Sequence, residues 1–179
     1  MTILAFDTAT TFGAVAAVSG GEVRTTPRAG DLLAVVDELL DDPAEIERIV
    51  VGRGPGSFTS IRIGLATARS LALTLGVPLS GASTLDAFDG GQPVLDARRG
   101  EVFTVGPSVA KPDEFDVEGR ALVGDGALRY RAVFEARGAT VAADGDPAHR
   151  PNPLLLVDRA TDDLDPLYVR DPDARPSRP

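Results

Sequence analysis

Cysteine is absent from this chain of 179 residues, and histidine occurs only once, as His149. The lack of cysteine excludes disulfide frameworks, thiolate zinc sites and cysteine nucleophiles. A single histidine excludes any site that needs two imidazoles, and its setting between Pro147 and Pro151 indicates an exposed loop residue. The chemistry open to the chain therefore rests on carboxylates, arginines, hydroxyl groups and the backbone.

Long apolar runs and clustered positive charge are missing as well. The longest apolar stretch, residues 71–79, is interrupted by Thr74, Gly76 and Pro78 and is too short to span a bilayer. The first ten residues contain Asp7 and no basic region, so we expect no signal peptide. The net charge of −9 argues against tight nucleic-acid binding by this chain alone, because such binding needs clustered Lys and Arg. We expect a soluble, cytoplasmic protein without a membrane partner.

The hydrophobic pattern indicates alternating strands and helices, with an α/β fold around a mixed sheet. Predicted strands cover residues 3–6, 13–18, 22–26, 49–51 and 77–80. Predicted helices cover residues 31–40, capped by Asp31, 58–75, ended by Gly76, and 83–88, capped by Ser83. Past residue 91 the sequence predicts a hairpin of residues 94–97 and 101–105, an amphipathic segment ending at Arg137, and a loosely ordered tail from Asp162. We expect a first lobe of residues 1–90 and a reduced second lobe with the tail over residues 91–179.

A glycine-rich loop, residues 52–59, lies between a predicted strand and the long helix. Backbone N–H groups at such a junction favour an anion, but the loop lacks the ending of a Walker A motif and the spacing of a dinucleotide fingerprint. The alternative is that its glycines only turn the chain while Ser57 caps the helix. Around it, Arg48, Arg53, Arg62 and Arg69 occur with no acid between Glu47 and Asp86. These arginines suit a phosphate or an acidic surface, or are simply solvated.

The long helix carries a stripe of small residues at four-residue spacing: Gly64, Ala68 and Ala72. Such a stripe lets another helix approach closely, and it overlaps a near-heptad apolar set. Two interpretations remain open, a face buried in the domain's own core or a partner interface. Among the acids, only Asp7 follows directly on a strand, where it could hold hydrated Mg²⁺, orient water or cap the turn.

Two motifs give the chain a resemblance to a known family. Residues 3–10 read ILAFDTAT, and residues 50–64 read VVGRGPGSFTSIRIG. Together with VLDARRGEVF at 94–103 and DPLYVR at 165–170, they resemble the bacterial TsaB (YeaZ) family, strongly across residues 1–105 and weakly over 106–160. The resemblance implies an actin-like ATPase-domain fold with two ribonuclease-H-like lobes, the second shortened here. It also implies a role in making threonylcarbamoyladenosine beside the anticodon of tRNA.

In that family, TsaB is a non-catalytic dimerisation subunit, so the resemblance implies no catalytic and no metal-binding residue here. The catalyst is the paralogue TsaD, which holds the metal, and TsaE, a P-loop ATPase, joins the two. We therefore expect no tightly bound cofactor, ATP and Mg²⁺ only at the level of the complex, and tRNA contacts only through the complex. When the partner is absent, a homodimer is an open alternative to a monomer.

Carried onto this sequence, the resemblance names two sets of residues. A degenerate nucleotide site, without glycine in the first hairpin until Gly13 and without lysine, comprises Asp7, Thr8, Thr10, Gly54, Gly56 and Ser57. A partner interface on the helices of residues 31–40 and 58–75 comprises Leu32, Val36, Phe58, Ile61, Arg62, Gly64, Leu65, Ala68 and Ala72. The chain departs from the family in having Arg28-Ala29 where members often have His-Ser.

An alternative from another class is a stand-alone ATPase or small-molecule kinase on the same fold. It would use Asp7 on the Mg²⁺ side and the glycine-rich loop for phosphate. The absence of a lysine near either loop argues against it. A third alternative, a metallopeptidase, is disfavoured by the lack of a His-Glu-x-x-His motif and of a second histidine.

Overall fold

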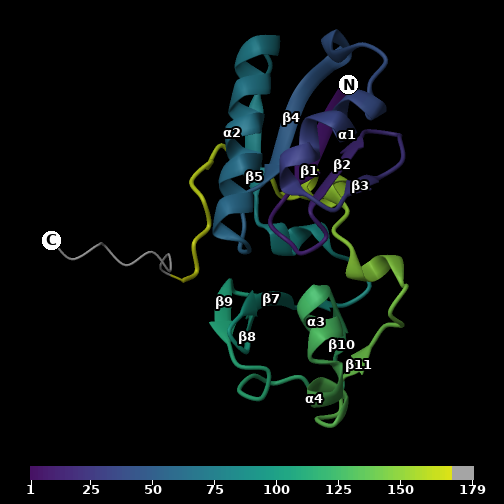
Figure 1. Cartoon of the computed structure of the whole chain (residues 1–179), viewed down its shortest axis with the longest axis vertical. Helices are drawn as coiled ribbons and strands as arrows, with labels where there is room; N and C mark the ends of the chain where they lie inside the picture. Colours follow the sequence, from purple (N-terminus) through teal and green to yellow (C-terminus); the bar gives the residue numbers. More distant parts are fainter. Residues whose placement is uncertain (171–179) are drawn as a thin grey trace, which may run out of the picture.

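The computed structural model describes residues 1–170, and its main feature is a five-stranded mixed sheet (Figure 1). The strand order is β3-β2-β1-β4-β5. The first three strands form an antiparallel meander, whereas β1, β4 and β5 run parallel. Their bounds are β1 Thr2–Asp7, β2 Ala14–Val18, β3 Arg24–Thr26, β4 Ile46–Gly52 and β5 Leu79–Ala82. The expected α/β class with a mixed sheet is confirmed.

Each buried strand of this sheet supplies side chains to two layers, because successive residues point to opposite faces. On β1, Leu4 and Phe6 pack beneath the helices α1 (Leu32–Leu39) and α2 (Phe58–Leu75). Ile3 and Ala5 face the other side, where Leu156 and neighbouring apolar residues cover them. The sheet is therefore the middle layer of the first part of the molecule.

The bounds of α2 agree with the predicted helix. The Ser57 side chain accepts a hydrogen bond from the N–H of Ser60, which satisfies one free donor of the first turn. Gly76 ends the helix in the left-handed conformation at φ 68°, which glycine adopts without steric cost.

Three shorter predictions need correction. Before α1 a 3₁₀ turn, Ala29–Asp31, continues into the helix, so the Asp31 side chain makes no capping hydrogen bond. The short helix after Ser83 is a 3₁₀ helix, Thr84–Ala87, although Ser83 caps it as expected. The amphipathic segment divides at Tyr130 into α3 (Asp125–Arg129) and α4 (Arg131–Glu135).

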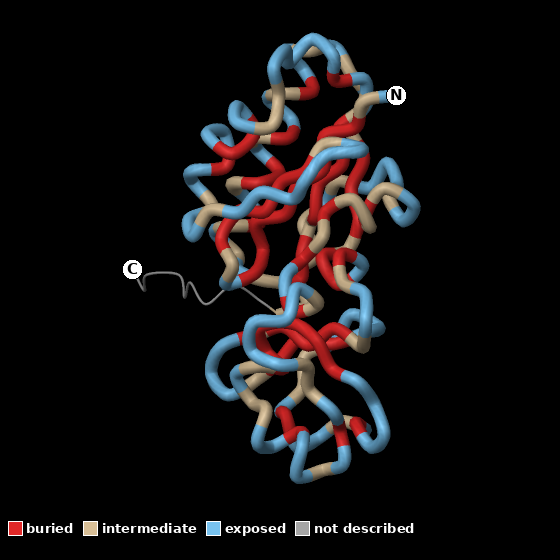
Figure 2. The backbone as a smooth tube through the Cα atoms, turned by 90° about the vertical axis from the view of Figure 1, so that its right-hand side faces the viewer, coloured by how far each residue is buried: buried red, intermediate tan, exposed pale blue. Residues whose placement is uncertain are grey.

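The second part of the molecule contains two small sheets below the first (Figure 1). One is the antiparallel sheet β7-β8-β9, which includes the predicted hairpin. The other is the parallel sheet β11-β10-β6, packed on a core around Phe134 and Leu122. The bounds are β6 Gln92–Pro93, β7 Leu95–Arg98, β8 Glu101–Thr104, β9 Ser108–Ala110, β10 Ala121–Val123 and β11 Thr140–Val141. A 3₁₀ helix at Pro147–His149 belongs to this part, whereas those at Pro43–Glu45 and Pro153–Arg159 belong to the first part or pack against it. Figure 2 shows buried residues in both parts and exposed loops around them.

The C-terminal segment, residues 162–170, returns to the first part. Just before it, the 3₁₀ helix Pro153–Arg159 inserts Leu156 into the core on the far face of the first sheet. Within the segment, the N–H of Leu167 donates to the carbonyl of Arg53 at 2.7 Å. Residues 153–170 therefore pack against the first part, although the predicted division at residue 90 assigns them to the second. The tail that we expected to be loosely ordered from Asp162 is ordered through Arg170, because polar contacts and side-chain packing hold it against the first part. The rest of the predicted tail lies outside the described residues.

Candidate functional site: the cleft between the two parts

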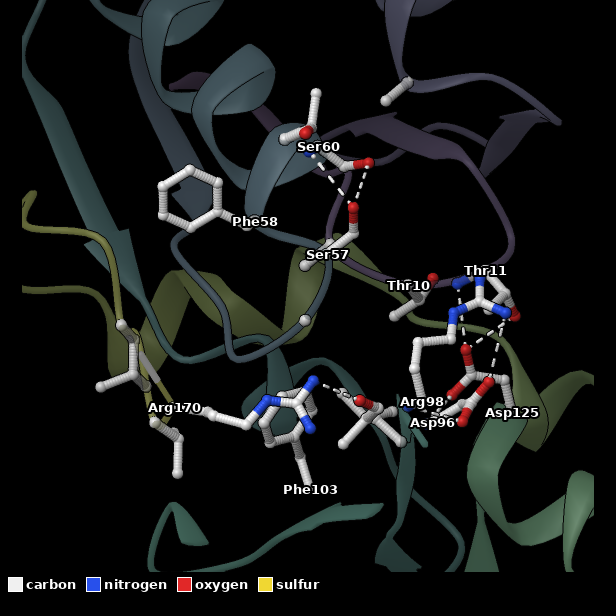
Figure 3. Close-up of a pocket in the computed structure, with 18 of the residues that line it drawn as sticks. Thr10, Thr11, Ser57, Phe58, Ser60, Asp96, Arg98, Phe103, Asp125 and Arg170 are labelled. Carbon is white, nitrogen blue, oxygen red and sulfur yellow. Dashed lines mark hydrogen bonds and ion pairs between the residues drawn. The ribbon is translucent and has the colours of Figure 1, made fainter. Parts of the chain in front are cut away.

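A cavity of about 560 Å³ lies between the first sheet and the small antiparallel sheet (Figure 3). The turn between β1 and β2 and the N-terminus of α2 form its upper wall. The β7–β8 hairpin and the start of α3 form its lower wall, and the C-terminal segment closes one side. Elements from both ends of the chain thus meet here.

The glycine-rich loop fits tightly against the first hairpin. A Cβ on Gly56 would lie 2.2 Å from the carbonyl oxygen of Ala9, and the N–H of Ser57 donates to that same oxygen at 2.8 Å. Gly54, at φ 102°, has no room for a Cβ beside Ile61. These glycines therefore serve close packing of the chain, whether or not a ligand binds.

Asp7 is fully buried at the end of β1 and does not line the cavity. Its Oδ2 accepts a hydrogen bond from the Thr84 hydroxyl at 2.6 Å, and its Oδ1 accepts one from the N–H of Ala9 at 2.7 Å. Burial raises the pKa of this carboxyl, although both hydrogen bonds oppose the shift. Gly52 makes the room, because a Cβ there would lie 1.7 Å from Oδ2. The side chain braces the strand ends, which disagrees with a role as a Mg²⁺-side acid in the cleft.

The six residues predicted for the nucleotide site separate into two groups. Thr10, Gly56 and Ser57 line the cavity. Asp7, Thr8 and Gly54 do not line it. Thr8 is buried and its hydroxyl donates to the carbonyl of Ser60 at 2.7 Å, so this residue, like Asp7 and Gly54, contributes to the packing of the chain. Three of the six predicted positions therefore line the cleft, and nucleotide binding there stays a prediction.

The charged side chains of the cleft all have partners within the chain. Asp125 accepts hydrogen bonds from Thr11 and from the N–H of Asp96. The Asp96 carboxylate forms ion pairs with Arg98 at 3.5 Å and with Arg129 at 3.7 Å. Arg170 pairs with Glu101 and donates to the carbonyl of Ala97. Sequence reasoning named none of the charged residues that line the cleft as site residues: Asp96, Arg98, Asp125 and Arg170. For Asp125 the only local signal is its place between two glycines, Gly124 and Gly126.

Three of the four arginines that we considered for a phosphate or an acidic surface instead contact the C-terminal segment. Arg53 pairs with Asp163 at 2.8 Å, and Arg69 donates to the carbonyl of Leu164 at 3.1 Å. Arg62 lies 4.4 Å from the centre of the Phe58 ring and donates to the hydroxyl of Tyr168. These contacts hold the segment against α2.

His149 is buried, and the expectation of an exposed loop residue is wrong. Its Nδ1 lies 3.1 Å from the backbone nitrogen of Gly124 and its Nε2 lies 2.9 Å from the carbonyl oxygen of Ala142. Accepting at Nδ1 and donating at Nε2, the ring fixes the backbone that leads into α3.

The partner interface predicted on α1 and α2 also needs correction. Seven of its nine residues are buried in the chain's own core and present almost no surface: Leu32, Val36, Ile61, Gly64, Leu65, Ala68 and Ala72. Within the small-residue stripe, Gly64 packs on the first hairpin, because a Cβ there would lie 2.4 Å from the hydroxyl oxygen of Thr8, and Ala68 and Ala72 belong to the core. Phe58 is half-buried and Arg62 is exposed. On the outer face, Leu33 of α1 is 55% exposed and Leu73 of α2 is 85% exposed.

Within residues 1–170, no cluster of three or more His, Cys, Asp or Glu side chains is arranged to hold a metal ion. In the same range, no helix has both the length and the apolar character needed to cross a membrane.

Comparisons with known proteins agree on one family. The family model described as TsaD, tRNA N6-adenosine threonylcarbamoyltransferase, matches residues 29–121. An uncharacterized protein of Mycobacterium tuberculosis is 35% identical, over 98% of this chain and 94% of its own length. The Escherichia coli tRNA threonylcarbamoyladenosine biosynthesis protein TsaB is 36% identical, over 58% of this chain and 53% of that protein.

Two solved structures from Pseudomonas aeruginosa share the fold. An uncharacterized protein with similarity to peptidase YeaZ superposes with a TM-score of 0.74 at 23% identity, covering 94% of this chain and 99% of that one. YeaZ itself superposes with a TM-score of 0.69 at 25% identity, covering 88% of this chain and 89% of that one. With the relatives above, these matches show that the chain belongs to the TsaB/YeaZ family.

Proposed function

We propose that this chain takes part in tRNA threonylcarbamoyladenosine biosynthesis as a TsaB-type subunit, pairing with a TsaD-like protein without performing the transfer itself. The names of the Escherichia coli and Bacillus subtilis relatives support the pathway. The observation that carries the non-catalytic role is the state of the cleft. Among the described residues, each charged side chain that lines it is already paired within the chain. A catalytic acid, base or nucleophile needs a free face toward its substrate.

The same proposal extends to fold and partners. The sheet order β3-β2-β1-β4-β5, antiparallel and then parallel, supports a first ribonuclease-H-like lobe of an actin-like fold, with a reduced second lobe. A TsaE-like P-loop ATPase joins the pair, tRNA binds only through the complex, and ATP with Mg²⁺ is used at the level of the complex.

The outer face of the helix layer is the surface that we assign to the TsaD-like partner. Leu33 of α1 and Leu73 of α2 expose apolar side chains there, and Ala66 of α2 is exposed as well. This surface replaces the buried stripe of the sequence-based prediction. Apolar contact on such a face is a main source of binding free energy in stable protein pairs.

The role is tested by reconstitution. The purified TsaD-like protein, TsaE-like ATPase, tRNA and activated substrate are incubated with and without this chain, and modified adenosine is quantified by nucleoside mass spectrometry. We expect product only when this chain is present. Equal product in its absence contradicts the proposed role.

The surface is tested with Leu73→Glu, and Val105→Glu serves as the matched control. Val105 is 48% exposed in the second part of the molecule, so both changes place a charge at an exposed apolar position. Leu73→Glu should abolish co-elution with the TsaD-like protein while the chain stays folded, and Val105→Glu should leave it intact. If Leu73→Glu pairs normally, this surface is not the interface.

A further inference from the structure

The carboxylate of Asp125 joins the first hairpin to the second part of the molecule across the cleft. Oδ2 of Asp125 accepts a hydrogen bond from the Thr11 N–H at 3.0 Å and another from the Thr11 hydroxyl at 2.7 Å. Oδ1 accepts a third, from the N–H of Asp96 at 2.9 Å. Thr11 belongs to the turn of the first hairpin, whereas Asp125 begins α3, 114 residues further along the chain (Figure 3).

The contact has the chemistry of anion recognition. An anionic oxygen that receives a backbone N–H and a hydroxyl from one turn is bound as a phosphate oxygen is bound. Asp125 accepts both of these hydrogen bonds from Thr11, so neither donor is available to another anion. A phosphate at this place would compete with the carboxylate and be repelled by it and by Asp96.

Asp125 is placed by a closely fitted backbone. The residue is 8% exposed. A Cβ on Gly124 would lie 2.6 Å from the carbonyl oxygen of Val94, and one on Gly126 would lie 2.6 Å from the backbone of Leu95, so only glycine lets α3 approach β7 this closely. Behind them, Nδ1 of His149 accepts a hydrogen bond from the N–H of Gly124. The carboxylate is thus held in position from three sides.

We propose that Asp125 is a built-in occupant of the anion site at the first hairpin and at the same time a latch that keeps the cleft closed. While the latch is formed, Thr11 has no donor to offer to a phosphate group. When Asp125 is removed, the two donors become available to inorganic phosphate. The inference goes beyond the proposed tRNA role and does not depend on it, because its test needs neither tRNA nor a partner.

The test follows the Thr11 amide of the full-length, ¹⁵N-labelled chain by hydrogen exchange, with and without inorganic phosphate. In the wild type we expect a protected amide whose exchange does not respond to phosphate. In Asp125→Ala, exchange should accelerate about tenfold, because the amide loses a hydrogen bond to a charged acceptor. Millimolar phosphate should then restore part of the protection. Asp116→Ala is the control, because it removes an equal charge from an exposed ion pair with Arg120 within the second part and should leave Thr11 unchanged.

Three results would overturn the proposal. Unchanged exchange of Thr11 in Asp125→Ala shows that the latch does not protect this amide. Accelerated exchange that phosphate leaves unaltered shows a latch but no anion site. Thr11→Val covers the case in which Asp125→Ala does not fold, because it keeps the N–H and Asp125 and removes only the hydroxyl. Its amide should exchange faster and ignore phosphate, whereas protection by phosphate in this variant contradicts the built-in occupant.

Discussion

Gly64→Ala tests whether the small-residue stripe of α2 belongs to the chain's own core. The new Cβ would lie 2.4 Å from the hydroxyl oxygen of Thr8, about 1 Å closer than van der Waals contact allows. Thr8 is fully buried and its hydroxyl donates to the carbonyl of Ser60 at 2.7 Å, so it cannot move without weakening that hydrogen bond.

The magnitude follows from three contributions. Overpacking of a dense core costs about 1–3 kcal/mol, and the lost hydrogen bond costs about 0.5–1.5 kcal/mol. Alanine in place of glycine within a helix returns about 1 kcal/mol. We expect a net loss of about 0.5–3.5 kcal/mol in the free energy of unfolding, measured by urea denaturation.

Two companion variants make the result specific. Gly30→Ala is the matched control, because a Cβ added there would meet no atom within 4 Å and the backbone is not in the left-handed region. It should be neutral or stabilise by about 0.4–1 kcal/mol. Adding Thr8→Ala to Gly64→Ala should recover part of the loss, since the two residues touch. A Gly64→Ala protein of undiminished stability that no longer pairs with the TsaD-like protein would refute the packing argument and return the stripe to the partner interface.

Two further predictions concern Asp7 and Leu156. Because burial holds the Asp7 pKa above its ordinary value of 3.8, the folded chain keeps a proton that the unfolded chain has lost. The free energy of unfolding of the wild type, relative to Asp7→Asn, should therefore fall as pH rises from about 4 through the raised pKa. The slope is at most about 1.4 kcal/mol per pH unit, measured by urea denaturation at a series of pH values. A rise over this range would contradict the burial argument. Leu156→Ala empties a fully buried position beneath the first sheet and should cost about 2–5 kcal/mol in the same assay, whereas a negligible loss would show that residues 153–159 do not complete this core.

Local chemistry explains which parts of the fold could be predicted from the sequence. The ends of α2 were predictable because Ser57 and Gly76 act on their own neighbours, as a capping acceptor and a left-handed terminator. The first hairpin and the β7–β8 hairpin followed from short apolar runs around polar turns. Asp31 failed as a cap because the preceding 3₁₀ turn runs into the helix, which a pattern of residue types does not reveal.

The site was harder to predict, because its contacts join distant parts of the chain. Asp125 meets Thr11 across 114 residues, and Arg53 meets the carbonyl of Asp165 across 112. Neither pair leaves a periodic signal in the sequence. By spacing alone, the stripe around Gly64 fits either a core or an interface, and its burial in the fold, with Thr8 against Gly64, decides between them. The sequence therefore pointed to three residues that line the cleft but not to the pairing of its charges.

The most direct test of the central claim is light scattering behind size exclusion, on this chain alone and mixed with the TsaD-like protein of the same organism. We predict a one-to-one complex in the mixture, replacing the monomer or homodimer of the isolated chain. Separate elution of the two proteins, with this chain well folded, would contradict its assignment as the pairing subunit.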